Sequence, residues 1–194
     1  MTRMQITFLL AGLAAGFVTV AGARALPMLL VYGVGPLFSI AILTAITASG
    51  SWPHVSSALW RILGAICICT GSYFVALFTF WIVGGYSPQL FGVRASIDPI
   101  DFGFDILIGL LAAALVASVG IEFLVYVLTG NWNNSSLLRF LAAGVITILV
   151  TFAVDRAAHR YWTFYGVLLP LGEGLFCAVV GAQIWRASEP VVRA

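Results

Sequence analysis

The chain has 194 residues, of which 62% are hydrophobic and only 8% are charged, and its formal net charge is +2. A soluble domain carries about 25% charged residues, so this composition excludes a water-soluble globular protein. The nine basic residues, all arginine, are spread along the chain and form no basic stripe, which argues against nucleic acid as a partner.

Long apolar runs follow one another along the whole sequence. A helix needs about 20 apolar residues to cross the hydrocarbon core of a bilayer. We expect a single integral membrane domain over residues 1–194, with the lipid bilayer around it and helices at about residues 5–23, 28–46, 59–83, 104–128, 137–154 and 163–185. The runs are continuous rather than alternating, so the predicted fold class is an all-α bundle of about six transmembrane helices.

The first run, residues 5–23, fits two interpretations. Arg3, the apolar run and the small residues after it have the order of a secretory signal peptide, whose cleavage would leave five helices. Its hydrophobic length and its small-xxx-small spacing instead favour a retained helix with a close packing face, formed by Ala11, Gly12, Ala15 and Gly16. We expect retention, and we expect this face to receive a partner helix in a homo-oligomer or in a complex with a larger membrane subunit.

The second run, residues 28–46, is interrupted by Gly33, Gly35 and Pro36. A proline removes one helical hydrogen bond and its ring clashes with the preceding turn. The helix is therefore expected either to kink in this region or to begin only at Pro36.

The arginines divide almost evenly between the two sides of a six-helix bundle. The positive-inside rule slightly favours a cytoplasmic location for the side that carries both termini. The corresponding expectation is a bacterial cytoplasmic (inner) membrane protein.

Glu173 is the most informative charged residue, because it lies near the middle of the last run. It is flanked by Pro170, Gly172 and Gly174, which loosen the helix. A charged side chain at the bilayer centre costs about 2.5–3.5 kcal/mol even on insertion scales, and interrupted helices build ion and substrate sites in transporters. We predict that these four residues contact an ion, a proton, a substrate or a partner. The alternative is a protonated or paired carboxyl that holds helices together.

Three further charged residues are weaker candidates for the same role. Glu122 lies near the end of the fourth run, where it either reaches the membrane interface or pairs helices. Asp155 and Arg156 form either a membrane-edge ion pair or a second charged contact site.

Enzymatic and metal-binding patterns are missing from the sequence. Cys67 and Cys69 are two residues apart and point to different faces of a helix, so neither a metal site nor a redox pair is expected. No hydrolase or metalloprotease motif is present, so we expect neither an enzyme nor a cofactor. A membrane enzyme acting on lipid is the third interpretation, and its only carboxylate cluster is Asp98, Asp101 and Asp105.

Several landmarks, taken in chain order, are similar to those of the small membrane subunit of tripartite tricarboxylate transporters: Ala23-Arg24-Ala25-Leu26-Pro27, Trp52-Pro53 before Leu59-Trp60-Arg61, Phe152-Ala153-Val154-Asp155-Arg156, and Tyr165-Gly166-Val167-Leu168-Leu169-Pro170-Leu171-Gly172. The resemblance implies a small partner of a larger permease and of a periplasmic solute-binding protein, in ion-driven uptake of carboxylates.

The favoured function is therefore a transport-associated membrane protein, either an accessory subunit or a small permease for a carboxylate-type or other small solute. The competing interpretation is a structural or assembly subunit of another membrane complex, for which no solute dependence is expected.

Overall fold

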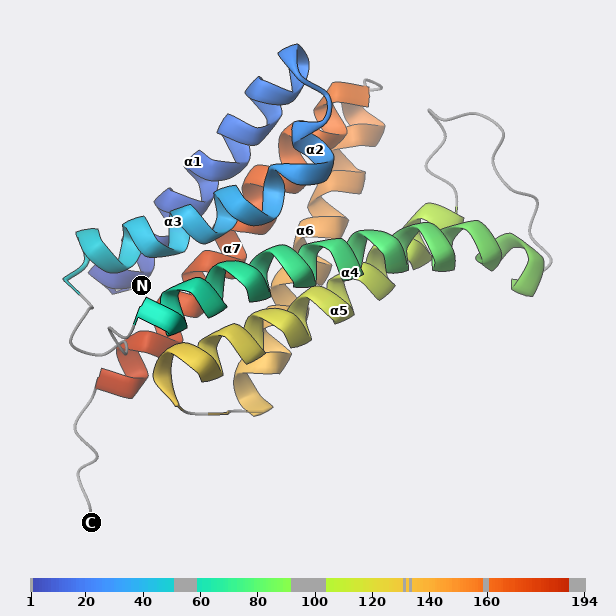
Figure 1. The fold of residues 1–194 in the computed structure, drawn as a ribbon. Coiled ribbons are helices and arrows are strands. Elements are labelled where there is room, and N and C mark those ends of the chain that lie inside the picture. The colour runs from blue at the N-terminus through green and yellow to red at the C-terminus, as the bar shows by residue number, and fades with distance from the viewer. Residues whose placement is uncertain are drawn as a thin grey trace.

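The structure is a computed structural model, and it describes residues 2–50, 59–91, 104–130, 132, 134–158 and 161–188. In these segments every regular element is a helix, which confirms the all-α prediction (Figure 1). The elements are α1 (Arg3–Ala25), α2 (Leu29–Tyr32), α3 (Val34–Ala48), α4 (Leu59–Phe91), α5 (Phe104–Thr129), α6 (Asn134–Ala158) and α7 (Tyr161–Ser188).

Five of the described helices are long and apolar enough to cross a membrane: Arg3–Ala25, Ile62–Gly85, Ile106–Thr129, Asn134–Asp155 and Tyr165–Ala187. The chain is therefore an integral membrane protein. The predicted first, fourth, fifth and sixth runs correspond closely to α1, α5, α6 and α7. The predicted end of the third run at residue 83 is too early, because α4 continues to Phe91.

The first helix begins earlier than the apolar run because its N-terminus is capped by side chains. The Thr2 hydroxyl accepts from the Gln5 backbone N–H at 3.2 Å, and the Gln5 side chain accepts from the Thr2 N–H at 2.8 Å. This reciprocal pair satisfies two N–H groups that have no partner inside the helix.

The second run is broken, as its glycines and proline indicated, and the break falls at Gly33 between α2 and α3. Pro36 has no N–H to donate to the carbonyl four residues earlier, that of Tyr32, and its ring crowds the same turn. The Gly33 N–H still donates to the Leu29 carbonyl at 2.9 Å, so the chain bends rather than unwinds. The longer piece, Val34–Ala48, is shorter than a full membrane span.

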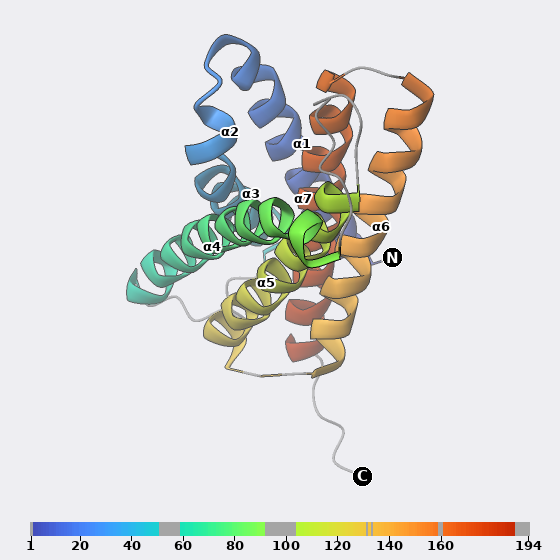
Figure 2. The same ribbon diagram turned by 90° about the vertical axis from the view of Figure 1, so that its right-hand side faces the viewer.

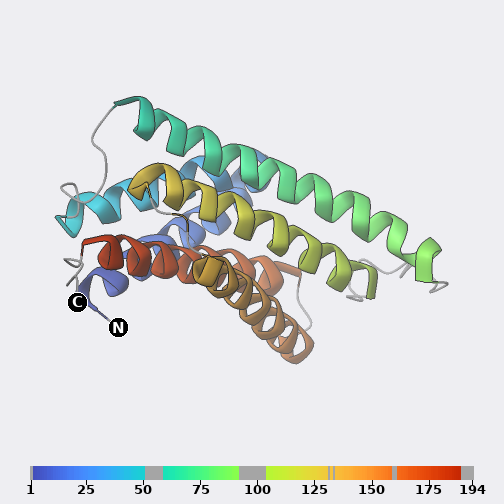
Figure 3. The same ribbon diagram turned by 90° about the horizontal axis from the view of Figure 1, so that it is seen from below.

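Two antiparallel pairs form most of the bundle. Helix α1 lies along α7, and α4 lies along α5 (Figures 1 and 2). Helix α3 joins the pairs by packing on α1 and α4, while α6 packs on α7 and α5. The helices converge near the N-terminus, and the α4–α5 pair diverges from the others toward its far end (Figures 1 and 3).

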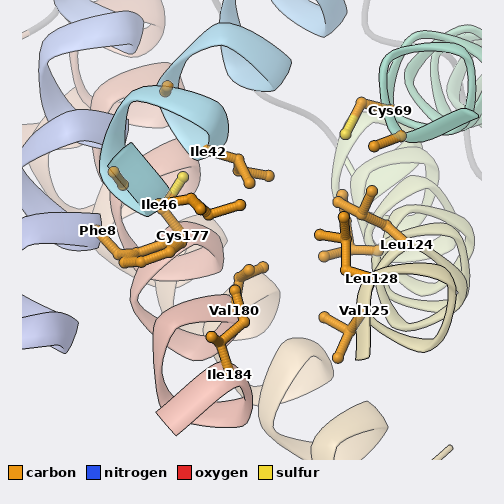
Figure 4. Packing of buried hydrophobic residues seen from close by; sticks show 14 of the residues in the cluster. Phe8, Ile42, Ile46, Cys69, Leu124, Val125, Leu128, Cys177, Val180 and Ile184 are labelled. Carbon is orange, nitrogen blue, oxygen red and sulfur yellow. The ribbon is translucent and has the colours of Figure 1, made fainter. Parts of the chain in front are cut away.

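The buried core lies where the helices converge (Figure 4). Each long helix contributes to it, with side chains that include Phe8, Ile42, Ile46, Cys69, Leu124, Leu128, Phe140, Cys177, Val180 and Ile184. The diverging α4–α5 pair is much less covered: 11% of the α4 span and 22% of the α5 span are buried. Because lipid solvates apolar side chains, these exposed faces are compatible with a bilayer.

Candidate functional site

Glu173 lies inside an uninterrupted helix. Although Pro170 stands one turn before it, α7 runs without a break from Tyr161 to Ser188. Proline has no N–H, so the carbonyl of Gly166 loses its helical partner at this level. The flanking glycines therefore do not break the helix; their role is in packing.

The backbone of α7 around Glu173 is packed directly against α1. A Cβ atom at Gly12 would fall 2.7 Å from the carbonyl carbon of Glu173, and one at Gly16 would fall 2.6 Å from the nitrogen of Pro170. On the other side of the contact, a Cβ at Gly174 would fall 2.9 Å from the Leu13 side chain. The small residues thus let the two backbones approach more closely than any larger side chain would allow.

This contact corrects the expected use of the small-residue face of α1. Gly12 and Gly16 are buried against α7 of the same chain, and Ala11 and Ala15 are partly buried against the core cluster. The face is occupied within the chain, so it is not available to a second subunit. Any oligomer must form through another surface.

The Glu173 side chain is 6% exposed, and both of its carboxylate oxygens are buried without a hydrogen-bond partner among the described residues. Successive helical positions show where it points. Pro170 and Gly174 face α1, and Gly172 faces Thr147 of α6. Glu173 lies angularly between these two contacts, on the same side as the core residue Cys177. It therefore faces the interior of the bundle.

Tyr73 of α4 is the residue that sequence analysis missed. The half-buried Tyr73 donates its hydroxyl to the carbonyl of Leu30, next to the bend between α2 and α3. Nothing in the sequence around Tyr73 distinguishes it, because its position depends on how α4 crosses α3. A Cβ at Gly35 would fall 2.8 Å from the Cα of Thr70 at this crossing.

Glu122 occupies a separate place in the bundle. It is 0% exposed, so it is buried rather than reaching for the membrane interface. It accepts a hydrogen bond from the hydroxyl of Ser136, which is also fully buried. This bond ties α5 to α6 and supports the interpretation of Glu122 as a helix-pairing residue.

Asp155, like Glu122, lies apart from Glu173. Thr147 marks the level of Gly172 on α6, and Asp155 lies eight residues further along, about 12 Å along the helix axis. Asp155 is 8% exposed near the end of α6. The side chain of Arg156, and residues Asp98 and Asp101, lie outside the described residues.

We next consider the side chains in the described parts of the chain that could bind a metal ion or a cofactor. They contain no group of three or more His, Cys, Asp or Glu side chains that could hold a metal ion. Cys67 is exposed and Cys69 is buried, as their spacing predicted. A cavity of about 10 Å³ lies between α3, α4 and α5 and is lined by Ser39, Ile42, Leu43, Ala65, Ile66, Cys69, Leu124 and Leu128. It is large enough for about one water molecule.

Comparisons with known proteins give no further assignment. No family model, no curated protein and no solved structure matches the chain. The fold and the site define the protein as an integral membrane helix bundle with a buried carboxyl at the centre of its last helix.

Proposed function

We propose that the protein is a transport-associated membrane protein in which Glu173 contacts a proton or a small cation. A single observation carries the proposal: a carboxyl group is buried at the middle of a membrane helix, and neither of its oxygens has a hydrogen-bond partner among the described residues. An unsatisfied buried polar group costs about 1–3 kcal/mol, and an unpaired buried charge costs more. Intramembrane ionisable residues with such a cost most often serve ion or proton pathways.

The resemblance to small subunits of tripartite tricarboxylate transporters favours an accessory subunit. In this proposal the chain works in a bacterial cytoplasmic membrane beside a larger permease and a periplasmic binding protein, and Glu173 takes part in the ion coupling of carboxylate uptake. A small permease that acts alone is the other form of the same proposal. Both forms require that the Glu173 carboxyl binds and releases a positive charge.

Carbodiimide labelling tests the carboxyl directly, without knowledge of the solute. A hydrophobic carbodiimide reacts with a protonated carboxyl in an apolar environment and not with a carboxylate. We expect peptide mass spectrometry of the protein in liposomes to find the label on Glu173. The labelling should fall when the pH is raised, and also when sodium is added if the bound ion is sodium.

Proton flux into proteoliposomes supplies the functional arm of the test. With a trapped pH-sensitive dye and an imposed potassium diffusion potential, wild-type protein should acidify or alkalinise the lumen faster than empty liposomes do. Glu173→Gln keeps the volume of the side chain and should remove the difference, whereas the control Glu122→Gln should retain it. The proposed role would be rejected if Glu173 were not labelled and no Glu173-dependent flux were found. Both results would have to hold for the protein alone and for membranes that contain its complex.

A structural or assembly subunit is the second candidate, and the exposed face of α4 favours it. Only 11% of the α4 span is buried, and a Cβ at Gly64 or Gly71 would meet no atom within 4 Å. The exposed Cys67 is a native probe for this face, with Cys69 and Cys177 as buried controls. Oxidation in native membranes should cross-link Cys67 to a neighbouring subunit if α4 is an assembly surface. An assembly role without transport also requires that Glu173→Gln leaves solute uptake unchanged.

A further inference from the structure

Three buried polar side chains form a stripe along the face of α6 that packs on α7. Thr147, Thr151 and Asp155 follow one another at intervals of four residues, so they share one face of the helix. Their exposed fractions are 3%, 0% and 8%. The stripe extends about 12 Å along the helix axis and ends in the last turn of α6.

The inner end of the stripe lies beside the Glu173 site. A Cβ at Gly172 would fall 3.4 Å from the Thr147 methyl carbon, so Thr147 contacts α7 one residue before Glu173. Helix α6 lies beside α7 (Figure 2). The Glu173 side chain points between the directions of α1 and α6, and both of its carboxylate oxygens are buried without a partner among the described residues. The unpartnered carboxyl and the stripe therefore meet at one level of the bundle.

The hydroxyl groups of the stripe present lone pairs rather than protons to their surroundings. Thr147 donates to the carbonyl of Ala143 at 2.8 Å, and Thr151 donates to the carbonyl of Thr147 at 2.7 Å. A hydroxyl has one proton to donate and two lone pairs, so both oxygens can still accept. Together with the carboxyl oxygens of Asp155, these acceptors suit a positive charge and disfavour an anion.

The opposite direction from Glu173 is closed by apolar packing. The face of α7 that carries the carboxyl continues as Cys177, Val180 and Ile184, which are each 0% exposed and belong to the core. Because Phe8 covers Gly181, this closed side holds the start of α1 and the end of α7 (Figure 1). The stripe leads to the other end of the bundle, where α6 ends and α7 begins.

We infer that Thr147, Thr151 and Asp155 line the route by which a proton or a small cation reaches Glu173, and that this route opens where α6 ends. The inference rests on the proposed role of Glu173. Asp155 attracts the positive charge at the edge of the membrane, and the two threonine oxygens solvate it in the interior. The Glu173 carboxylate then binds it, either as a proton that makes the carboxyl neutral or as the cation of an ion pair. The cytoplasmic location expected for the termini places the opening on the periplasmic side.

The other charged residues of the described helices around Glu173 lie off this route. Arg24 of α1 is at the same end of the bundle as the opening but is exposed, and the exposed Arg3 and Arg186 are at the other end. Arg139 of α6 lies about 12 Å along the axis from the inner end of the stripe, on the closed side. Glu122 is hydrogen-bonded within the contact between α5 and α6, and α3 carries no charged residue.

The reaction of an introduced thiol with silver ions tests the route. Silver is a small monovalent cation that binds thiols, and a thiol that has bound it escapes later alkylation, which peptide mass spectrometry detects. The full chain is studied in sealed membrane vesicles of both orientations, and a cleavable tag after α7 identifies the side of the termini. We expect Thr151→Cys to react with silver added on the opposite side. Leu149→Cys is the matched control, because Leu149 is 60% exposed at nearly the same depth and faces lipid. It should not react, nor should the native Cys177.

Asp155 is tested in the Thr151→Cys background. Asp155→Asn should slow the silver reaction about fivefold, since it removes one opposite charge near the path of the ion. Asp155→Glu keeps the charge and should retain the rate. The inference is contradicted if Thr151→Cys reacts no faster than Leu149→Cys, if it reacts from the side of the termini, or if Asp155→Asn leaves its rate unchanged.

Carbodiimide labelling of Glu173 in wild type serves if Thr151→Cys does not fold. In sealed vesicles the labelling should fall when the pH is raised on the side of the opening, and not when it is raised on the other side. Sodium added on the side of the opening at constant pH should protect Glu173 only if the bound ion is sodium. A response from the side of the termini alone would reject the route and keep the proposed role of Glu173. A response from neither side, with Thr151→Cys reactive toward silver, would reject the proposed role itself.

Discussion

Gly12 of α1 lies against the main chain of Glu173 in α7, so closely that a Cβ at Gly12 would fall 2.7 Å from the Glu173 carbonyl carbon. The residue that carries the buried carboxyl is thus fixed by its backbone, while its side chain points into the bundle between the directions of α1 and α6. A rigid backbone with an unsatisfied side chain is the arrangement expected of a binding group rather than of a mobile surface residue.

Replacing Gly12 should weaken the α1–α7 pairing. In Gly12→Ala the added methyl group meets backbone atoms, which cannot rotate away, and overpacking of this kind costs about 1–3 kcal/mol. We expect a lower midpoint of thermal unfolding in detergent, followed by the fluorescence of a cysteine-reactive dye that reports exposure of Cys177. Gly71→Ala is the control, because a Cβ there meets no atom within 4 Å. An equal decrease in the unfolding midpoint of both variants would mean that the close approach at Gly12 makes no specific contribution to stability.

Removing the Ser136 hydroxyl should destabilise the α5–α6 pairing. Ser136→Ala leaves Glu122 buried with one donor fewer, and the loss of one partner from a buried hydrogen bond costs about 1–3 kcal/mol. The unfolding midpoint should fall, while carbodiimide labelling of Glu173 should not change. Ser135→Ala, at an exposed neighbouring position, is the control. A change in labelling of Glu173 would show that the two carboxyl sites are coupled.

Truncation of a core phenylalanine should be much more costly than truncation of a lipid-facing residue on the same helix. Phe8 is 0% exposed where α1 packs on α7, and Leu10 is 59% exposed. Phe8→Ala should cost about 3–5 kcal/mol, because it removes buried contacts and leaves a cavity. Leu10→Ala should change the unfolding free energy much less, since its side chain faces lipid in both states. A comparable decrease in the unfolding free energy of both variants would mean that the outer face of α1 packs against protein rather than lipid.

The N-terminal peptide should be retained in the membrane-embedded protein. Cleavage after α1 would remove Phe8 from the core and uncover Gly174 and Gly181 of α7, which α1 side chains cover. Mass spectrometry of the purified chain should therefore find the peptide that contains Arg3. A mature N-terminus at Arg24 or Ala25 would show that the rest of the bundle is stable without α1.

The sequence predicted the helices well because the signal for them is local. Length and hydropathy of each run are enough to predict α1, α5, α6 and α7, and Pro36 predicts the bend of the second run. The end of α4 was misplaced, because hydropathy falls after residue 83 while the helix itself continues to Phe91. A decrease in hydropathy predicts where a helix leaves the bilayer rather than where it ends.

The candidate site was predicted only in part. The carboxyl of Glu173 was identified from its depth in the last run, and the packing of Gly12 and Gly16 from their spacing. The partner of those glycines was assigned wrongly to another subunit, because spacing predicts that a helix packs closely but not which helix it meets. The burial of Glu122 and the position of Tyr73 had no sequence signal.

The sequence by itself determined that this protein lies in a membrane, that it is made of helices, and that one carboxyl is carried to the middle of the last of them. Only the tertiary structure decided that α1 covers α7, that Glu173 faces the interior, and that Tyr73 of α4 is bonded to Leu30 beside the α2–α3 bend. The physical reason lies in the solvent. In a soluble protein the outer face of a helix is polar and the buried face is apolar, so the sequence pattern indicates which face is buried. In lipid the outer face is as apolar as the core. Leu10 and Phe8 are therefore both large apolar residues, and only the packing of the helices decides that Phe8 is buried and Leu10 is exposed.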